Sequence, residues 1–208
     1  MPGSFGLAAE HDRVGASQRW QSGKFEVRWH RHGFEIGQHR AGVYRPLLAP
    51  PPNQPLIAAS KAHLLHRENR GSFSIKFGPE PFSEQIEILK AIPRNHSLSL
   101  SGRLVGQGQQ ASFRLELQMR DSQQLGMSLK VDGAASLRLQ LKLDPQAYYR
   151  GLGAQPSRLE LRGGRYEMLA QEAGIGRGAQ PLSSLVNLVS PGSAGHAGTS
   201  YYPQPVFW

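Results

Sequence analysis

Acidic side chains are the first candidates for chemistry, because proton-transfer and nucleophilic sites need such groups held together at a reacting atom. The four aspartates are spread singly along the chain, at Asp12, Asp121, Asp132 and Asp144. Each lies in the N-terminal tail or between two apolar segments, where Asp is common because its carboxylate accepts hydrogen bonds from the following backbone. The sequence therefore predicts turn or tail positions for all four and no catalytic pair of carboxylates.

Other reactive side chains form no recognisable group either. The chain has no cysteine, which excludes a thiolate nucleophile, a disulfide framework and a Cys-ligated zinc. Two histidine pairs, His30 with His32 and His63 with His66, lack a third ligand at a spacing that suits zinc, so they are interpreted as surface histidines. The glycine-rich run 174–178 lacks the Lys-Ser/Thr of a phosphate-binding loop. We expect no metal and no cofactor.

The elements that position these residues are predicted to be strands, because apolar side chains recur at every second residue. The clearest runs are 113–119, 125–131 and 136–143, and in the last of these every leucine falls on one face. Short polar turns separate the runs. We therefore expect them to form a meander with one buried and one solvated face.

Shorter alternating runs come earlier, at intervals of about ten residues, which is typical of a sandwich or barrel. They lie at 25–29, 34–36, 73–77, 86–88 and 98–100. Residues 49–55 include four prolines, which cannot donate ladder hydrogen bonds, so a loop is predicted there. No window predicts an amphipathic helix longer than two turns. The predicted fold class is all-β, an antiparallel β-sandwich over residues 23–208, preceded by a disordered or extended tail over 1–22.

The net charge of +9, from 24 basic and 15 acidic residues, raises the question of an anionic partner. Lys and Arg are dispersed, however, and many occupy the polar positions of alternating runs. Nucleic acid is therefore not expected as a partner. No apolar run approaches the ~18 residues that span a bilayer, and the first twenty residues hold no continuous apolar stretch. We expect no membrane partner and a cytoplasmic location.

Beyond residue 145 the alternation fades and glycine and proline become frequent, so a loop-rich C-terminal third is predicted. Long loops attached to a rigid sheet are often functional or interfacial. The chain then reaches Val206, Phe207 and Trp208, an apolar run that is unusual for a solvated terminus. We expect this run to contact further protein.

Three motifs lie in this part of the chain. Residues 148–155 and 159–163 read Y-Y-R-G-L-G-A-Q … L-E-L-R-G, similar to Y-G-x-G-E-Q … D-L-R-G. Residues 172–177 are similar to S-E-Q-G-V-G-R, and 201–205 to F-P-Q-P. Together with residues 70–76, which are similar to a strand at the matching place in the same group, these motifs resemble glycoside hydrolase family 31, the α-glucosidases and sulfoquinovosidases. Their order and approximate spacing agree over nearly the whole chain.

The resemblance implies one part of an enzyme. In this family a non-catalytic N-terminal β-sandwich of galactose-mutarotase-like fold precedes a (β/α)8 barrel, which alone takes about 250 residues. The family's two catalytic aspartates lie on that barrel. By this resemblance the chain is expected to be inactive alone. It is also expected to pack on a catalytic barrel domain of the same or a separate chain, and to lend a barrel-facing loop to a carbohydrate site.

The same resemblance implies four residues at the rim of the substrate pocket, Gln155, Glu172, Arg177 and Gln204. Arg177 could hold an anionic group or a polyol through its planar set of donors. Alternatively, Arg177 pairs with Glu172 and only pins the loop. Ala154 stands where the family motif has Glu, so a preference for sulfosugars over glucosides does not carry over to this chain.

A free-standing carbohydrate-binding module is the alternative interpretation. Such modules stack exposed aromatic rings on sugars, and the candidates are Trp20, Trp29, Tyr44, Tyr148 and Tyr149. Trp29 is in phase with the apolar residues of its own run, so it is predicted to lie in the core.

Overall fold

The structure is a computed structural model that describes most of the chain. The described residues are 17–61, 64–69, 72–77, 82–153, 160–163, 174–176, 178–191, 193–195 and 202–207. They are mostly β, in antiparallel sheets, with one short helix. The chain divides into two compact units: Met1–His63 with Pro79–Lys142 is the first unit, and Leu64–Gly78 with Leu143–Trp208 is the second unit.

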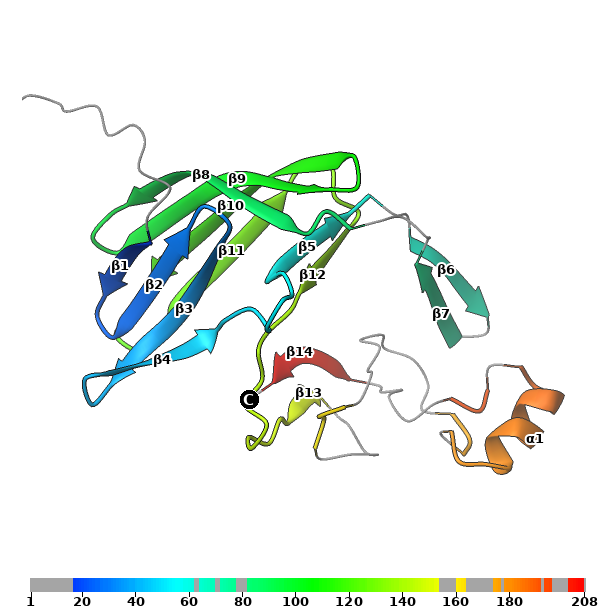
Figure 1. Ribbon diagram of the computed structural model, residues 1–208. Helices are drawn as coiled ribbons and strands as arrows, with labels where there is room; N and C mark the ends of the chain where they lie inside the picture. Colours follow the sequence, from blue (N-terminus) through cyan, green and yellow to red (C-terminus); the bar gives the residue numbers. More distant parts are fainter. Residues whose placement is uncertain are drawn as a thin grey trace, which may run out of the picture. The chain divides into compact units, whose positions relative to one another are not determined.

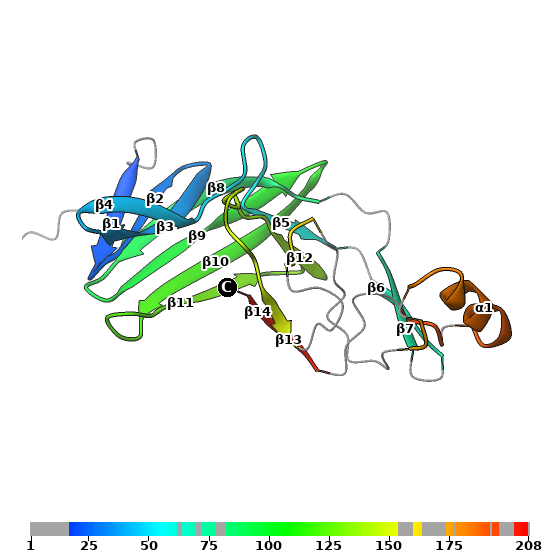
Figure 2. The ribbon, with the colours of Figure 1, turned by 90° about the horizontal axis from the view of Figure 1, so that it is seen from below.

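Two four-stranded antiparallel sheets make up most of the first unit (Figure 1 and Figure 2). One has the order β1-β2-β3-β4, with β1 at Gln18–Ser22, β2 at Phe25–His30, β3 at Gly33–Arg40 and β4 at Val43–Leu48. The other has the order β11-β10-β9-β8, with β8 at Gln85–Pro93, β9 at Ser97–Gly106, β10 at Gln109–Met119 and β11 at Leu125–Val131. A separate pair joins β5 (Ile57–Ser60) to β12 (Ser136–Leu139). Strands adjacent in sequence pair throughout both larger sheets, as short hairpin connections allow.

One hydrophobic core is built from both sheets of the first unit. Its buried members are Trp20, Val27, Trp29, Phe34 and Ile36 from the first sheet, Ile86, Ile88, Leu98, Leu100, Leu104, Phe113, Leu115 and Leu117 from the second, and Leu56, Ile57 and Ala59 around β5. Along β10 buried and exposed side chains alternate, as predicted for a sheet with one solvated face. Trp29 lies in the core, which confirms the prediction for that side chain.

The prediction that residues 136–143 continue the meander is wrong. β11 is the outer strand of its sheet, and β12 pairs with β5 instead, in the register Leu137↔Ala59 and Leu139↔Ile57. Leu137 and Leu139 are also 49% and 45% exposed, so this leucine face is only partly covered. Alternation indicates a strand and its two faces, but it does not identify the strand with which it pairs.

The first sheet begins inside the segment predicted to be a tail. β1 pairs with β2 from Gln18↔Trp29 to Ser22↔Phe25, so ordered pairing starts at residue 18 and not at residue 23. The loop predicted at residues 49–55 is confirmed. It contains a turn in which the Gln54 N–H donates to the Pro51 carbonyl oxygen at 3.2 Å.

The second unit contains two strand pairs and the helix. β6 (Leu64–Asn69) pairs with β7 (Ser72–Phe77), which covers the strand predicted at 73–77. β13 (Gly151–Gly153) pairs with β14 (Pro203–Phe207). α1 (Leu182–Val189) has eight residues, close to the two turns that the sequence allows. No helix in the described part of the chain is both long and apolar enough to cross a bilayer.

Candidate functional site

Two of the family motifs meet in one small sheet of the second unit. β13 belongs to the motif at 148–155, and it pairs with β14, which begins in the motif at 201–205. Gly153, whose partner is Pro203, has a φ of 80°. A Cβ at Gly153 would lie 2.1 Å from the Tyr202 carbonyl oxygen. Glycine is required there, because an L side chain avoids this φ and the facing backbone cannot move aside cheaply.

A carboxylate joins the two halves of the first motif. Glu160 Oε1 accepts hydrogen bonds from the backbone N–H groups of Tyr149 at 3.2 Å and Arg162 at 3.0 Å. The Leu161 N–H donates to the Tyr149 carbonyl oxygen at 2.8 Å. The Arg162 guanidinium donates to Glu160 Oε2 at 3.0 Å and to the Pro145 carbonyl oxygen. The backbone N–H of Arg162 is the main reason that the pKa of Glu160 is lowered. Glu160 therefore acts as an ionised anchor of the loop and not as a proton donor.

The glycine-rich motif at 172–177 contacts a second loop through its described residues, 174–176. The Ile175 N–H donates to the Ser193 carbonyl oxygen at 3.0 Å. Gly174 has a φ of 73°, and a Cβ there would lie 2.4 Å from the backbone nitrogen of Gly195. Ala194, which lies between these contacts, is fully buried. The two backbones thus approach too closely for a side chain at Gly174.

Gln204 is the one predicted rim residue that the structure describes. It lies exposed on β14, and its side-chain amide donates to the Tyr202 hydroxyl at 3.0 Å. Gln155, Glu172 and Arg177 lie outside the described residues. Their position at the rim, and the alternative pairing of Arg177 with Glu172, remain predictions.

The aspartates that the structure describes lie in turns, as predicted. Asp121 Oδ1 accepts hydrogen bonds from the backbone N–H groups two and three residues later, at 2.7 and 2.9 Å. Asp144 Oδ1 accepts one from the N–H two residues later, at 2.8 Å. Asp132 lies in the turn that follows β11, and Asp12 is outside the described residues. Asp121 and Asp144 therefore stabilise the turns that connect the strands.

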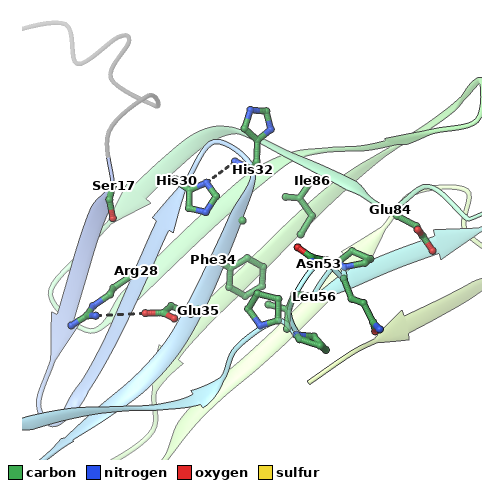
Figure 3. Close-up of a pocket in the computed structure, with 15 residues that line it drawn as sticks. Ser17, Arg28, His30, His32, Phe34, Glu35, Asn53, Leu56, Glu84 and Ile86 are labelled. Atoms are coloured by element: carbon green, nitrogen blue, oxygen red, sulfur yellow. Dashed lines mark hydrogen bonds and ion pairs between the residues drawn. The ribbon is translucent and has the colours of Figure 1, made fainter. Parts of the chain in front are cut away.

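The first unit carries a pocket of about 560 Å³ beside the β2–β3 turn (Figure 3). Arg28 and Glu35 lie on one side of it, and Asn53 and Glu84 lie on the other. Each carboxylate faces an arginine: Glu35 lies 3.6 Å from Arg28, and Glu84 lies 3.9 Å from Arg138. Because a cation neutralises each acid, the pocket is suited to polar contacts more than to proton transfer.

His30 and His32 line the same pocket. The His32 backbone N–H donates to His30 Nδ1 at 3.1 Å, and both residues are exposed, as is His66 on β6. His63 is outside the described residues. Within the ranges that the structure describes, no three His, Cys, Asp or Glu side chains gather as metal ligands.

A buried ionic cluster on β2 and β3 was not predicted from the sequence. Glu26 is only 2% exposed, and its carboxylate lies 2.5 Å from Arg28 Nε and 2.7 Å from His39 Nε2. The guanidinium of Arg28 lies over the Tyr44 ring, 3.6 Å from its centroid, so β4 helps to cover the cluster. Burial alone would raise the pKa of Glu26, but the hydrogen bonds from His39 and Arg28 outweigh it and lower the pKa. The only signal in the sequence is the i, i+2 spacing of Glu26 and Arg28, which puts them on one face of a strand.

Comparison with known proteins relates the chain to one group of enzymes. No family model matches the sequence. The chain is 30% identical over 142 residues to the sulfoquinovosidase of Escherichia coli (strain K12), a match that covers 66% of this chain and 20% of that protein. Among solved structures it resembles a GH31 family sulfoquinovosidase from E. rectale in complex with the aza-sugar inhibitor IFGSQ. The TM-score is 0.64 at 17% identity, with 91% of this chain and 26% of that chain covered.

The second comparison concerns the fold alone, because its sequence identity is low, whereas the first is a match of sequence. The chain spans only about a fifth to a quarter of the length of these two proteins. In sequence and in structure, the chain is therefore similar to the N-terminal region of family 31 sulfoquinovosidases, over part of their length.

Proposed function

We propose that this chain is the non-catalytic N-terminal β-sandwich, of galactose-mutarotase-like fold, of a family 31 glycosidase. In this proposal it packs on a catalytic (β/α)8 barrel that these 208 residues do not contain, and it lends loops of the second unit to the rim of the barrel's sugar site. The absence of cysteine is compatible with the cytoplasm, which is the compartment we propose.

One observation carries the proposal: motifs separated by some fifty residues are joined by backbone contacts in the second unit. β13 of the first motif pairs with β14 of the last, and Glu160 ties the two halves of the first motif together. A loop that must present side chains to a ligand on another domain needs such a fixed backbone, because a loosely held group loses its geometry. The exposed Gln204 is placed on this backbone.

The coverage of the relatives supports a partner domain. About three quarters or more of each compared enzyme lies outside the matched part. A (β/α)8 barrel needs about 250 residues, which is more than the whole length of this chain. The proposed barrel must therefore come from further sequence on the same polypeptide or from another chain.

A free-standing carbohydrate-binding module has less support. Trp20 and Trp29, two of its five aromatic candidates, are buried in the core, and the Trp20 indole N–H donates to the Arg94 carbonyl oxygen at 2.7 Å. Tyr44 lies under the Arg28 guanidinium. These three rings are thus engaged within the protein, whereas sugar stacking needs open faces.

Activity measurements with and without a barrel test the proposal. The chain is assayed alone, and after co-expression with a family 31 catalytic barrel encoded in the same genome (the barrel partner), on nitrophenyl α-glucoside and nitrophenyl α-sulfoquinovoside. We expect turnover only from the complex, and the preferred substrate identifies the sugar class. Hydrolysis by the 208-residue chain alone would overturn the proposal.

A further inference from the structure

Helix α1 exposes its apolar side chains and buries a polar one, the reverse of a usual surface helix. Its buried residue is Ser183, which is 3% exposed, whereas Leu188 and Val189 are 81% and 87% exposed. Successive residues of a helix are about 100° apart, so a single exposed face collects the apolar residues Leu182, Leu185, Leu188 and Val189. These four residues are called the apolar face of α1.

The opposite, polar side of the helix contacts its own unit. Asn187 Oδ1 accepts a hydrogen bond from the Ala194 N–H at 3.3 Å, just beyond the helix. The hydroxyls of Ser190 and Ser193 are hydrogen-bonded at 2.6 Å. A surface helix of a monomeric domain normally buries its leucines, whereas the buried residue of α1 is Ser183. These contacts fix the orientation of α1 with its leucines turned outward.

The sequence around α1 is also free of charge. Residues 178–208 contain no Asp, Glu, Lys or Arg, although such residues make up 19% of the chain. Solvated surfaces of small proteins carry charged side chains at high density. The buried centres of protein interfaces, in contrast, are depleted in charge and rich in apolar groups. The lack of charged residues and the exposure of apolar side chains therefore both indicate that this segment is part of an interface.

We infer that the apolar face of α1 is a docking surface for the catalytic barrel, and that the barrel covers it with an uncharged, apolar surface. This inference rests on the proposed function and adds to it the place of contact. The barrel is the favoured occupant because the matched enzymes carry most of their chain outside the region that this protein spans.

Two other occupants fit less well. A second copy would bring another net charge of +9, and the two copies would repel each other. Helices that lie on lipid surfaces carry Lys and Arg on their polar side, whereas α1 and all residues after it have neither. Both occupants remain distinguishable in the test.

Site-specific photo-crosslinking tests the inference on the full chain. p-Benzoylphenylalanine replaces Leu188, or in a control Val43, which is 60% exposed on β4 of the first unit, and each variant is co-expressed with the barrel partner. We expect crosslinks to the barrel from position 188 and none from position 43. In a second experiment, Leu188→Lys should reduce the amount of co-purified barrel at least tenfold, whereas Val43→Lys should not. Both lysine variants should keep the wild-type Tm, because both side chains are exposed.

The outcomes separate the inference from the proposed function. If the complex forms but position 188 does not crosslink and Leu188→Lys retains the barrel, the docking surface is refuted and the proposed function stands. Crosslinks between two copies of the chain, or to lipid, would also refute the barrel as occupant. If no complex forms with the wild-type chain, the proposed function fails together with the inference.

Discussion

Replacing Glu26 by Gln tests whether the buried ionic cluster stabilises the first sheet. The substitution keeps the shape of the side chain and removes its charge. In the wild type the carboxylate receives two charge-assisted contacts, from Arg28 Nε at 2.5 Å and from His39 Nε2 at 2.7 Å. The amide can keep hydrogen bonds in their place, but its oxygen carries no negative charge, so Arg28 loses a buried counter-ion.

The expected loss follows from the strengths of these bonds. Hydrogen bonds to charged groups contribute about 1.5–3 kcal/mol each, and neutral ones contribute about 1 kcal/mol. Replacing the charged acceptor of both bonds by a neutral amide should lower the free energy of unfolding by about 2 kcal/mol. For a protein of this size, that loss corresponds to a decrease in Tm of about 4–8 °C.

The pH dependence of the loss gives a stricter test. The pKa of Glu26 lies below its ordinary value of 4.5 in the folded protein. Its charged form therefore stabilises the fold above the unfolded-state pKa, and this stabilisation is lost as the pH falls through the lower folded-state pKa. The difference between wild type and Glu26→Gln should be largest near pH 7 and should shrink below about pH 4.

Urea unfolding, followed by tryptophan fluorescence between pH 3 and pH 7, measures this difference, because Trp20 and Trp29 lie in the core of the first unit. Glu116→Gln is the matched control: Glu116 is exposed on β10, so its free energy of unfolding should change by less than about 0.5 kcal/mol. If Glu26→Gln is as stable as the wild type at pH 7, or if its deficit is the same at pH 3, the cluster does not stabilise the sheet as described.

Three further changes test the core and the loops of the second unit. The Gly153→Ala variant should have a lower melting temperature of the second unit than the Gly163→Ala variant. Both glycines have a positive φ, but of the two only Gly153 has facing backbone within 2.1 Å of the added Cβ. Equal melting temperatures in scanning calorimetry would contradict this steric explanation. Leu115→Ala, at a fully buried core position, should lower the free energy of unfolding by about 2–5 kcal/mol in urea titrations, and a loss below about 1 kcal/mol would argue against this core. Gln204→Ala should lower the kcat/KM of the complex with the barrel partner about tenfold, which corresponds to about 1.4 kcal/mol, whereas the control Gln85→Ala on β8 should leave it unchanged. An unaltered kcat/KM of Gln204→Ala would show that Gln204 does not lie at the rim.

The strands of the first unit could largely be predicted from the sequence, because side-chain period follows directly from strand geometry. β10 is the clearest case, since Phe113, Leu115 and Leu117 are buried and their neighbours are exposed. Partner choice could not be predicted in the same way. β12 has equally regular leucines, yet it pairs with β5, some eighty residues earlier in the chain, and a local pattern carries no information on such distant pairing.

The environment of single polar residues could be predicted least. Glu26 occupies a position that alternation assigns to solvent, but Arg28, His39 and the Tyr44 ring cover it. That cover depends on side chains from two neighbouring strands, so it exists only after the sheet has formed. The candidate site was predicted from its motifs, and the structure adds backbone contacts in the second unit that join the first motif to the last and the two halves of the first motif to each other.

The mass of the assembled protein tests the central claim most directly. Multi-angle light scattering on the co-expressed chain and barrel partner should give the sum of one 22.9 kDa chain and one barrel. Turnover of the nitrophenyl glycosides should elute only with that peak. If the chain elutes alone at its own mass beside an active, separate barrel, the chain is not the missing N-terminal part of such an enzyme, and the account is contradicted.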